Sequence, residues 1–377
     1  MSSARICIGH VVHAFSVGGE ERELANIVRY GDGVRCRHVI VALTEVGDFG
    51  KDLPQDRCTV VALRKQPGND WSIPGKLATI FKREQVTVVH ARGWATLVET
   101  ALAAWWARVP IRIYAFHGKT ISELSGISLK RRLLQALAIR LYTRLVTLNR
   151  LMQQDLAREC WLPRSRIAVI RNGIDSSQFR PKEDRKALRQ RYGIPGDQFV
   201  VGTVGRLDPV KNHEGLLAAV RQLCDAGHSI YVLIVGEGEH RGVLECEIKR
   251  LNLQGHVCLF GFSDRVADLL NCMDAYVQSS WYEGASHTIV EAMACGVPVI
   301  ASRVGGTSEF FHLSQQDMLF DPHEVAQLTA RLLRVMQDKV FRYQYTREIR
   351  ESALERFSVT AMVGSYEKLY AGEAVDL

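Results

Sequence analysis

Short runs of apolar residues alternate with longer amphipathic stretches along the whole chain. In the first half, runs such as 37–43 (RHVIVAL) and 111–116 (IRIYAF) are rich in β-branched residues and have the length of buried strands. The stretches between them, such as 21–31 (ERELANIVRYG), carry apolar residues at helical spacing. The second half repeats this alternation, for example at 199–205 (FVVGTVG) and 230–236 (IYVLIVG).

Alternating βα units of this kind predict parallel sheets with helices on both faces. We therefore expect an α/β fold of two doubly wound, Rossmann-like domains that face a central cleft, with ligands outside the carboxyl ends of the strands. The boundary is expected near 176–181, after the turn-forming Asn172-Gly173 and before a charged helix at 183–194. This gives a first domain over residues 1–178 and a second over 179–356.

The composition is that of a globular protein. The chain has 377 residues, of which 47% are hydrophobic and 24% are charged, which suits about two domains. The apolar run at 101–107 is far shorter than the roughly 20 residues that span a bilayer. His10 and His13 interrupt the apolar N-terminus, which is typical of a first strand and not of a signal peptide, so we expect a cytoplasmic protein. Nine cysteines without a CxxC pair offer neither a zinc site nor a disulfide framework.

Charge is distributed unevenly between the two halves. Residues 1–180 contain 27 Lys and Arg against 15 Asp and Glu, whereas residues 181–377 contain 21 against 26. The densest basic stretch, 129–150, repeats leucine every fourth residue and places arginines on other faces, which predicts an amphipathic helix. Such a basic half can meet an anionic membrane surface, a phosphorylated acceptor or nucleic acid, and the alternative is ordinary solvated surface. No nucleic-acid partner is expected, because the chain lacks the signatures of zinc fingers, helix-turn-helix units and RNA-binding sheets.

The strongest chemical signal runs from 282 to 302 (YEGASHTIVEAMACGVPVIAS). Glu283 precedes a short helix that is expected to start near His287 or Thr288 and to end at Gly296, and Glu291 stands one turn inside it. The first amides of a helix favour an anion, and carboxylates accept hydrogen bonds from sugar hydroxyls. The segment therefore fits a sugar, a pyrophosphate and a ribose in sequence. In the structural alternative, Glu283 is a helix cap and Glu291 a surface residue.

Two further segments are typical of phosphate binding. In 202–212 (GTVGRLDPVKN), Arg206 leaves the carboxyl end of a strand and Lys211 follows five residues later, and two fixed cations suit a diphosphate. Gly18 and Gly19 form the first strand-to-helix turn, where backbone amides can approach a phosphate. Alone, the first pattern fits any basic loop, and the second lacks a complete dinucleotide-binding or P-loop motif.

Together these segments resemble the retaining nucleotide-sugar glycosyltransferases of family 4, which have the GT-B fold. The resemblance spans essentially the whole chain, and the Glu-x7-Glu block is its most specific part. In chain order it is carried by the glycine turn at 18–19, FHG at 116–118, IRNGID at 170–175, GRLDPVKN at 205–212, VGEGEHR at 235–241, LFGF at 259–262, EGASHTIVEAMACGVPVIAS at 283–302 and VGGTSEF at 304–310. It implies that a last helix, about 357–377, packs back on the first domain.

The resemblance also implies roles for individual residues. Arg206 and Lys211 would hold the donor diphosphate and stabilise the leaving group. Glu291 would bind the ribose hydroxyls and Glu283 the transferred sugar, with His117 beside that sugar as a further catalytic residue. The other donor-binding residues would be Gly18, Gly19, Gly205, Phe262 and the backbone amides of Ala285, Ser286, His287, Thr288 and Ile289.

Acceptor residues are expected at strand ends and loops of the first domain. The candidates are Ser16, Arg92, Trp94 and Lys119, each with a structural role as the alternative.

The expected mechanism follows from charge development. When the bond between sugar and phosphate breaks, negative charge grows on the diphosphate, and prepositioned cations and helix amides stabilise it. The chain has no D-x-D motif, and the resemblance implies Arg and Lys in place of a metal ion, so neither a metal nor another cofactor is expected. The resemblance implies retention of configuration. We expect same-face attack by the acceptor hydroxyl, with Glu283 as the rival candidate for a nucleophile.

The sequence therefore predicts a retaining enzyme that moves a hexose-type sugar from a UDP- or GDP-sugar to a hydroxyl of a lipid-linked oligosaccharide or polysaccharide, as in polysaccharide or lipopolysaccharide biosynthesis. It would be cytoplasmic, with peripheral attachment to the inner face of the membrane through its basic half. Two alternatives stay open. One is another GT-B activity, such as a nucleotide-sugar epimerase. The other is a non-catalytic scaffold that binds membrane or nucleic acid.

Overall fold

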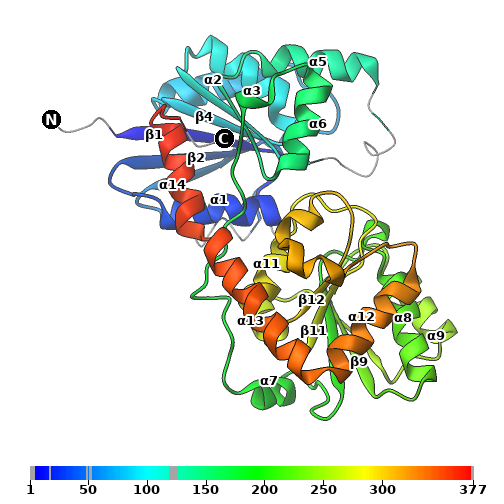
Figure 1. Cartoon of the computed structure of the whole chain (residues 1–377). Coiled ribbons are helices and arrows are strands. Elements are labelled where there is room, and N and C mark those ends of the chain that lie inside the picture. Colours follow the sequence, from blue (N-terminus) through cyan, green and yellow to red (C-terminus); the bar gives the residue numbers. More distant parts are fainter. Residues whose placement is uncertain are drawn as a thin grey trace. The chain divides into compact units, whose positions relative to one another are not determined.

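The chain forms two compact units. The computed structural model describes residues 5–16, 18–47, 50, 53–118, 126 and 128–374. Unit 1 comprises Met1–Gly173 and Val359–Leu377, and unit 2 comprises Ile174–Ser358. Each unit contains a parallel sheet with helices packed on it (Figure 1), so the expected α/β class is confirmed.

In the described part of unit 1, seven strands form one parallel sheet in the order β3-β2-β1-β4-β5-β6-β7. They are β1 (Ile6–Val12), β2 (Cys36–Ala42), β3 (Cys58–Ala62), β4 (Val88–Arg92), β5 (Ile111–Phe116), β6 (Arg144–Thr147) and β7 (Ile167–Val169). Both faces are buried. Along β1, Cys7 and Val11 enter the core on one face and Ile8 and Val12 enter the cores on the other, which is the two-residue period of a strand.

Helices cover both faces of this sheet. They are α1 (Gly19–Tyr30), α2 (Ile73–Arg83), α3 (Trp94–Trp106), α5 (Leu129–Ile139), α6 (Arg150–Cys160) and α14 (Val359–Tyr370), with a 3-10 turn at Arg164–Arg166. α2 and α3 pack on the face of Cys7, whereas α1 and α14 pack on the face of Ile8. The last helix of the chain therefore lies beside the first (Figure 1).

The amphipathic helix expected over 129–150 is wrong beyond Ile139, where α5 ends. The chain then re-enters the sheet as β6, with Leu145 and Val146 buried between β5 and β7. Thr143 fixes this return, because its N–H donates to Arg112 O at 2.8 Å and its hydroxyl accepts from the Arg112 N–H at 2.9 Å. The four-residue leucine spacing therefore continues by coincidence from the helix α5 into the strand β6.

Unit 2 is described throughout, and six strands form its parallel sheet in the order β10-β9-β8-β11-β12-β13. They are β8 (Phe199–Val204), β9 (Ile230–Val235), β10 (Val257–Gly261), β11 (Ala275–Gln278), β12 (Val299–Ser302) and β13 (Leu319–Phe320). The α-helices are α7 (Arg185–Arg191), α8 (His213–Asp225), α9 (Arg241–Arg250), α10 (Val266–Asn271), α11 (His287–Ala294), α12 (Val325–Gln337) and α13 (Lys339–Arg356). Short 3-10 turns span Pro209–Lys211, Thr307–Phe310 and Leu313–Met318.

The helix expected after Glu283 is confirmed as α11. It starts at His287, and Gly296 follows its end with a φ of 69°, in the left-handed region that favours glycine.

The strand order reverses once in each sheet, between β1 and β4 in unit 1 and between β8 and β11 in unit 2. In doubly wound folds, ligands bind beyond the carboxyl ends of the strands at such switch points. In unit 2 the loops that leave β8 and β11 carry the residues 205–212 and 279–286. The fold thus brings the two strongest sequence signals to one edge of one sheet. Within the part of the chain that the structure describes, no helix has the length and apolar character of a membrane span.

Candidate active site

The loop after β8 carries the two cations that the sequence singled out. Arg206 points into solvent with 80% of its side chain exposed, and its guanidinium lies 3.9 Å from the Asp208 carboxylate. Lys211 ends the following 3-10 turn. Next, Asn212 starts α8 with a φ of 48°, and its carboxamide donates to the carbonyl of Ser279 at 3.1 Å. This bond ties the cationic loop to the residues that follow β11.

Lys211 and Glu283 form an ion pair at this edge of the sheet. The Lys211 Nζ donates to Glu283 Oε2 at 2.7 Å, and the two side chains keep 21% and 12% of their surfaces exposed. The same Oε2 accepts from Gln278 Nε2 at 2.9 Å and from Ser280 Oγ at 3.4 Å. Among the described residues, no donor contacts Oε1. Glu283 is thus held with one carboxylate oxygen directed to the protein.

Glycines of two further motifs fix the backbone beneath this pair. Gly305 has a φ of 50°, and a Cβ there would lie 2.0 Å from the Glu283 carbonyl oxygen. The N–H of Gly306 donates to that same oxygen at 3.0 Å. Likewise Gly236, with a φ of 144°, packs so closely that a Cβ would lie 1.8 Å from Gly205 O. Side chains at Gly236 and Gly305 would therefore displace the loops that carry Arg206 and Glu283.

The first turn of α11 is capped by Ser286, whose hydroxyl accepts from the Ile289 N–H at 3.4 Å. The Ile289 amide, expected to face a phosphate, is therefore committed to the cap. The Thr288 hydroxyl lies 2.7 Å from the Tyr276 hydroxyl. Burial raises the pKa of Tyr276, against the lowering effect of that hydrogen bond, so this phenol stays protonated. The predicted residues Ala285 and His287 are half-buried in the same turn.

The remaining donor residues of unit 2 differ in accessibility. Gly205 directly follows β8 and donates to Val235 O at 3.0 Å. Phe262, just beyond β10, is exposed. Glu291 is only 2% exposed inside α11, so the surface role of the structural alternative does not hold.

In unit 1, the predicted acceptor residue Arg92 is buried. Its Nη1 lies 3.3 Å from Glu23 Oε1, with both side chains almost wholly enclosed. Burial lowers the pKa of Arg92, but Glu23, Tyr366, Tyr370 and Glu20 together outweigh it, and the pKa lies above its ordinary value. Tyr366 of α14 donates its hydroxyl to the same Glu23 oxygen at 2.7 Å. Contact between the Arg92 guanidinium and an acceptor is incompatible with this burial, so the structural alternative replaces that expectation.

His117 is the predicted catalytic residue of unit 1. It follows β5, and its Nδ1 lies 3.7 Å from Glu23 Oε2, so Glu23 faces both His117 and Arg92. Trp94 begins α3 beneath the Arg131 guanidinium, which lies 4.2 Å from the ring centre. Ser16 follows β1 and is half-buried.

The first glycine turn lies at the start of α1. Gly18 is the N-cap residue and Gly19 the first helical residue, followed by Glu20 and Glu21 in the first turn. Lys119, the fourth acceptor candidate, lies outside the described residues.

Three buried polar residues at these two sites were not expected from the sequence. Gln278 and Tyr276 stand on the buried strand β11, and Glu23 stands on α1 beside the core residues Leu24 and Ile27. A polar side chain at a position where the periodicity calls for an apolar one is the signal that could have identified them.

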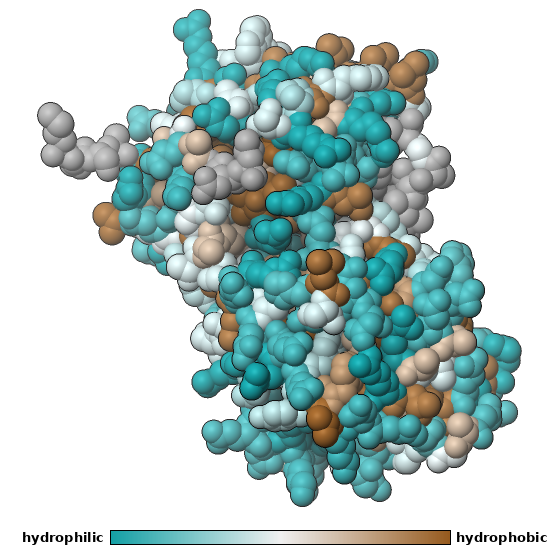
Figure 2. All heavy atoms as spheres, viewed as in Figure 1, coloured by the Kyte–Doolittle hydropathy of each residue, from teal (hydrophilic) through white to brown (hydrophobic). Residues whose placement is uncertain are grey.

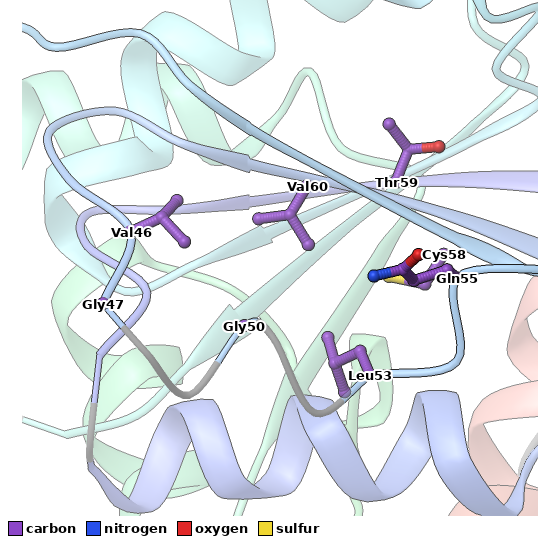
Figure 3. A pocket seen from close by; sticks show the side chains of 8 residues that line it. All are labelled: Val46, Gly47, Gly50, Leu53, Gln55, Cys58, Thr59 and Val60. Carbon is purple, nitrogen blue, oxygen red and sulfur yellow. The ribbon is translucent and has the colours of Figure 1, made fainter.

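Unit 1 also has a pocket beside the start of β3 (Figure 3). Its described lining carries no charge and no predicted site residue, so it offers a diphosphate no counter-ion. The lining comprises Val46, Gly47, Gly50, Leu53, Gln55, Cys58, Thr59 and Val60. Among the described residues, no three His, Cys, Asp or Glu side chains gather in a group that could hold a metal ion. All nine cysteines are free thiols.

Comparison with protein families matches both units. A family model described as Glycosyltransferase Family 4 matches residues 17–178. A second, described as Glycosyl transferases group 1, matches residues 184–355. The matched segments contain the glycine turn, the cationic loop and the two glutamates.

Individual relatives are distant but extend over most of the chain. The UDP-Gal:alpha-D-GlcNAc-diphosphoundecaprenol alpha-1,3-galactosyltransferase of Escherichia coli is 26% identical over 307 residues, 80% of this chain and 79% of that enzyme. The N-acetyl-alpha-D-glucosaminyl L-malate synthase of Bacillus anthracis is 24% identical over 309 residues, 81% and 79% of the two chains. Among solved structures, Anabaena HepE in complex with UDP and glucose superimposes with a TM-score of 0.86 at 22% identity, covering 98% of this chain and 100% of that one. The GT-B fold is thereby confirmed.

Proposed function

The chain belongs to the family 4 glycosyltransferases, and from that premise we propose a retaining enzyme with a nucleotide-sugar donor. It transfers a hexose-type sugar from a UDP- or GDP-sugar to a hydroxyl of a lipid-linked oligosaccharide or polysaccharide. The E. coli relative, named for a UDP-sugar donor and a diphosphoundecaprenol-linked acceptor, supports both halves of this proposal. HepE, solved with UDP and glucose, supports a uridine nucleotide.

The observation that carries the proposal is the grouping of Arg206, Lys211 and Glu283 at the switch point of unit 2. Arg206 is exposed and free to turn its planar guanidinium toward a diphosphate, while Lys211 supplies a fixed point charge. As the bond between the sugar and the phosphate breaks, both cations stabilise the charge that grows on the leaving diphosphate. These side chains take the place of a divalent metal in the proposed reaction.

Glu283 binds the transferred sugar in this proposal. Its Oε2 already accepts from Lys211 and Gln278, and this leaves Oε1 to accept from a sugar hydroxyl. Such an arrangement supports a hydrogen-bonding role over attack on the anomeric carbon, which requires a carboxylate oxygen at the reacting atom. The acceptor hydroxyl then attacks from the face that the diphosphate leaves, and the configuration is retained.

Other residues complete the donor site. The amides of Ala285, Ser286, His287 and Thr288 bind the donor, Gly205 lines the site, and Phe262 packs near the base. Glu291 binds the ribose. Because Glu291 is enclosed in the structure, a ribose reaches it only when the side chains that cover it move. Of the residues of unit 1, Gly18 and Gly19 contact the diphosphate and His117 contacts the sugar in this proposal. The acceptor is contacted by Ser16, Trp94 and Lys119.

Thermal unfolding in the presence of nucleotides tests the donor site. UDP, GDP, ADP, CMP and their sugar conjugates are compared, each with and without EDTA. A ligand at about 100 times its Kd stabilises the folded protein by roughly 2.7 kcal/mol. We expect one nucleoside diphosphate to raise the Tm, with EDTA having no effect and Arg206→Ala abolishing the shift. Arg334→Ala is the matched control, since Arg334 is another partly exposed arginine of unit 2. If no nucleotide raises the Tm, the proposed donor function is wrong.

The lipid-linked acceptor places the enzyme at a membrane, and we propose that α5 meets the anionic surface there. Leu129, Leu133, Leu134 and Leu137 of this helix are exposed, and Figure 2 shows a hydrophobic patch over it. The exposed cations Lys130 and Arg140 belong to the same stretch. Apolar residues beside cations are typical of helices that lie in a membrane interface.

Co-sedimentation with vesicles tests this surface. We expect binding to phosphatidylglycerol vesicles, weaker binding to phosphatidylcholine vesicles, and a loss of binding when Leu133 and Leu137 are both changed to Ser. The control is Leu313→Ser, because Leu313 is a leucine of unit 2 that is even more exposed than Leu133 and Leu137. If the double variant binds as well as the control, α5 is not the membrane surface.

A further inference from the structure

A chain of hydrogen bonds connects the first turn of α11 to the carboxylate of Glu283. The Ile289 N–H donates to Ser286 Oγ at 3.4 Å, and Ser286 Oγ lies 3.0 Å from Thr288 Oγ1. Thr288 Oγ1 lies 2.7 Å from the Tyr276 hydroxyl. The Tyr276 hydroxyl donates in turn to Gln278 Oε1 at 2.7 Å. Gln278 Nε2 then reaches Glu283 Oε2 at 2.9 Å.

The two ends of this chain fix the direction of every bond in it. An ionised carboxylate can only accept, so the amide of Gln278 must present Nε2 to Glu283 and Oε1 to Tyr276. That oxygen can only accept, so Tyr276 donates to it and must itself accept from Thr288. Thr288 has then used its single proton, so it accepts from the Ser286 hydroxyl, which itself accepts from the Ile289 N–H. All five links therefore point from α11 toward Glu283.

Bonds aligned in one direction polarise one another, and a buried, fully satisfied chain is rigid. Tyr276 and Gln278 are both buried on β11, so water does not compete with the bond between them, and the links to Thr288 and Glu283 are partly buried. The chain adds a directed donor to the two that Glu283 Oε2 already receives from Lys211 and Ser280. Rotation of the carboxylate would break all three bonds, because they meet at one oxygen.

We propose that Tyr276 and Gln278 are positioning residues, which lock Glu283 so that Oε1 alone faces the donor sugar. Recognition of the sugar, as distinct from the nucleotide, then depends on this chain of hydrogen bonds from Ile289 to Glu283, which we call the relay. The inference rests on the proposed function for the role of Glu283. The relay itself is a property of unit 2 without any ligand, so its test does not require a donor.

A double-mutant cycle without ligand tests the relay. Tyr276→Phe removes one oxygen, Glu283→Gln removes the charge at the far end, and the two residues do not touch directly. We expect their combined effect on the unfolding equilibrium constant of unit 2 to depart from the product of the single effects by at least roughly twofold. Tyr345→Phe is the matched control, since that buried hydroxyl of unit 2 donates to a backbone carbonyl, Val299 O, at 2.7 Å. Hydrogen exchange of the full chain reports on unit 2 separately. If the coupling between Tyr276→Phe and Glu283→Gln is no larger than that between Tyr345→Phe and Glu283→Gln, the relay is wrong.

Binding measurements test whether the relay positions Glu283 for the donor sugar. The Kd values of UDP, UDP-glucose and UDP-galactose, and of GDP and GDP-mannose, are measured for the full chain by calorimetry. In Tyr276→Phe and Gln278→Leu we expect an unchanged Kd for the nucleoside diphosphate and a Kd for the sugar conjugate that is weaker by roughly twofold to tenfold. Tyr345→Phe should change neither. Equal weakening of both ligands overturns the positioning role. If wild-type protein binds no nucleotide, the proposed function fails, and the cycle alone decides the relay.

Discussion

Each unit has a glutamate–cation pair at the switch point of its sheet, and the two pairs are built in opposite ways. In unit 1, Glu23 follows β1 and Arg92 ends β4, and both side chains are enclosed. In unit 2, Lys211 follows β8 and Glu283 follows β11, and both keep part of their surface exposed. The same topological position therefore holds an internal charge pair in one unit and an accessible one in the other.

The difference lies in what surrounds each pair. In unit 1, the last helix of the chain supplies Tyr366, which donates to Glu23 and lies beneath the Arg92 guanidinium at 5.8 Å. In unit 2, the donors among the described residues converge on Oε2 of Glu283 and leave Oε1 without a donor. The unit 1 pair is enclosed by its own unit and contributes to folding, although the Arg92 nitrogens make no hydrogen bond among the described residues. A pair with an exposed, unused acceptor suits a ligand. Substitutions at the two pairs should separate stability from binding.

Glu23→Ala should have the largest effect, on the stability of unit 1. The substitution leaves the Arg92 guanidinium buried without its carboxylate, and breaking a buried pair in this way costs about 3–5 kcal/mol. Urea denaturation followed by tryptophan fluorescence measures it, because five of the six tryptophans, at positions 71, 94, 105, 106 and 161, belong to unit 1.

The control is the corresponding change in unit 2, Lys211→Ala. Glu283 keeps Gln278 and Ser280 as donors there, so the free energy of unfolding should fall by only about 1 kcal/mol. Replacing both members of the unit 1 pair by apolar residues, Glu23→Leu with Arg92→Met, should restore much of the lost stability. Equal losses in Glu23→Ala and Lys211→Ala would remove the distinction between the pairs.

The fold of both units follows from local sequence, but the enclosed pair does not. Runs rich in Val and Ile identified the long strands, whereas β7 and β13 have three and two residues and form only by pairing with a neighbouring strand. Lys211 and Glu283 stand out because each follows a strand end within a recognisable motif. Glu23 has no such motif, because its partner Tyr366 lies 343 residues away in the sequence. Only the tertiary fold identifies such a residue.

Acid should destabilise unit 1 more than unit 2, because unit 1 contains more buried histidines whose pKa values are lowered by burial. Burial lowers the pKa of His38 to about 4, with smaller contributions from Arg57 and Arg5, and burial lowers that of His213 in unit 2 to about 4 as well. Unit 1 contains two more buried histidines, His10 and His90, whose pKa values lie well below the ordinary value.

The sign follows from proton binding. An unfolded histidine takes up its proton near pH 6.5 and the folded one near pH 4, so the unfolded state binds more protons in between. Stability is therefore fully present above about pH 6.5 and is lost as the pH falls toward 4. Hydrogen exchange between pH 7 and pH 4 should show unit 1 opening first, and His38→Gln should reduce that pH dependence. If both units lose protection at the same pH, the buried histidines do not set the acid stability.

The smallest effect is expected at two helix caps, one in each unit. Ser286 caps α11, and the Asn149 side chain caps α6 by accepting from the Met152 N–H at 2.8 Å. Loss of either cap should cost about 1 kcal/mol in the free energy of unfolding, because each leaves a first-turn amide without its acceptor. Ser286 also begins the relay to Glu283, whereas Asn149 lies in the other unit. Ser286→Ala should therefore weaken binding of UDP-glucose or UDP-galactose, whichever the wild-type protein binds, while Asn149→Ala leaves it unchanged at a similar loss of Tm. A similar loss of affinity in both variants would mean that stability alone, and not the path from α11 to Glu283, governs donor binding.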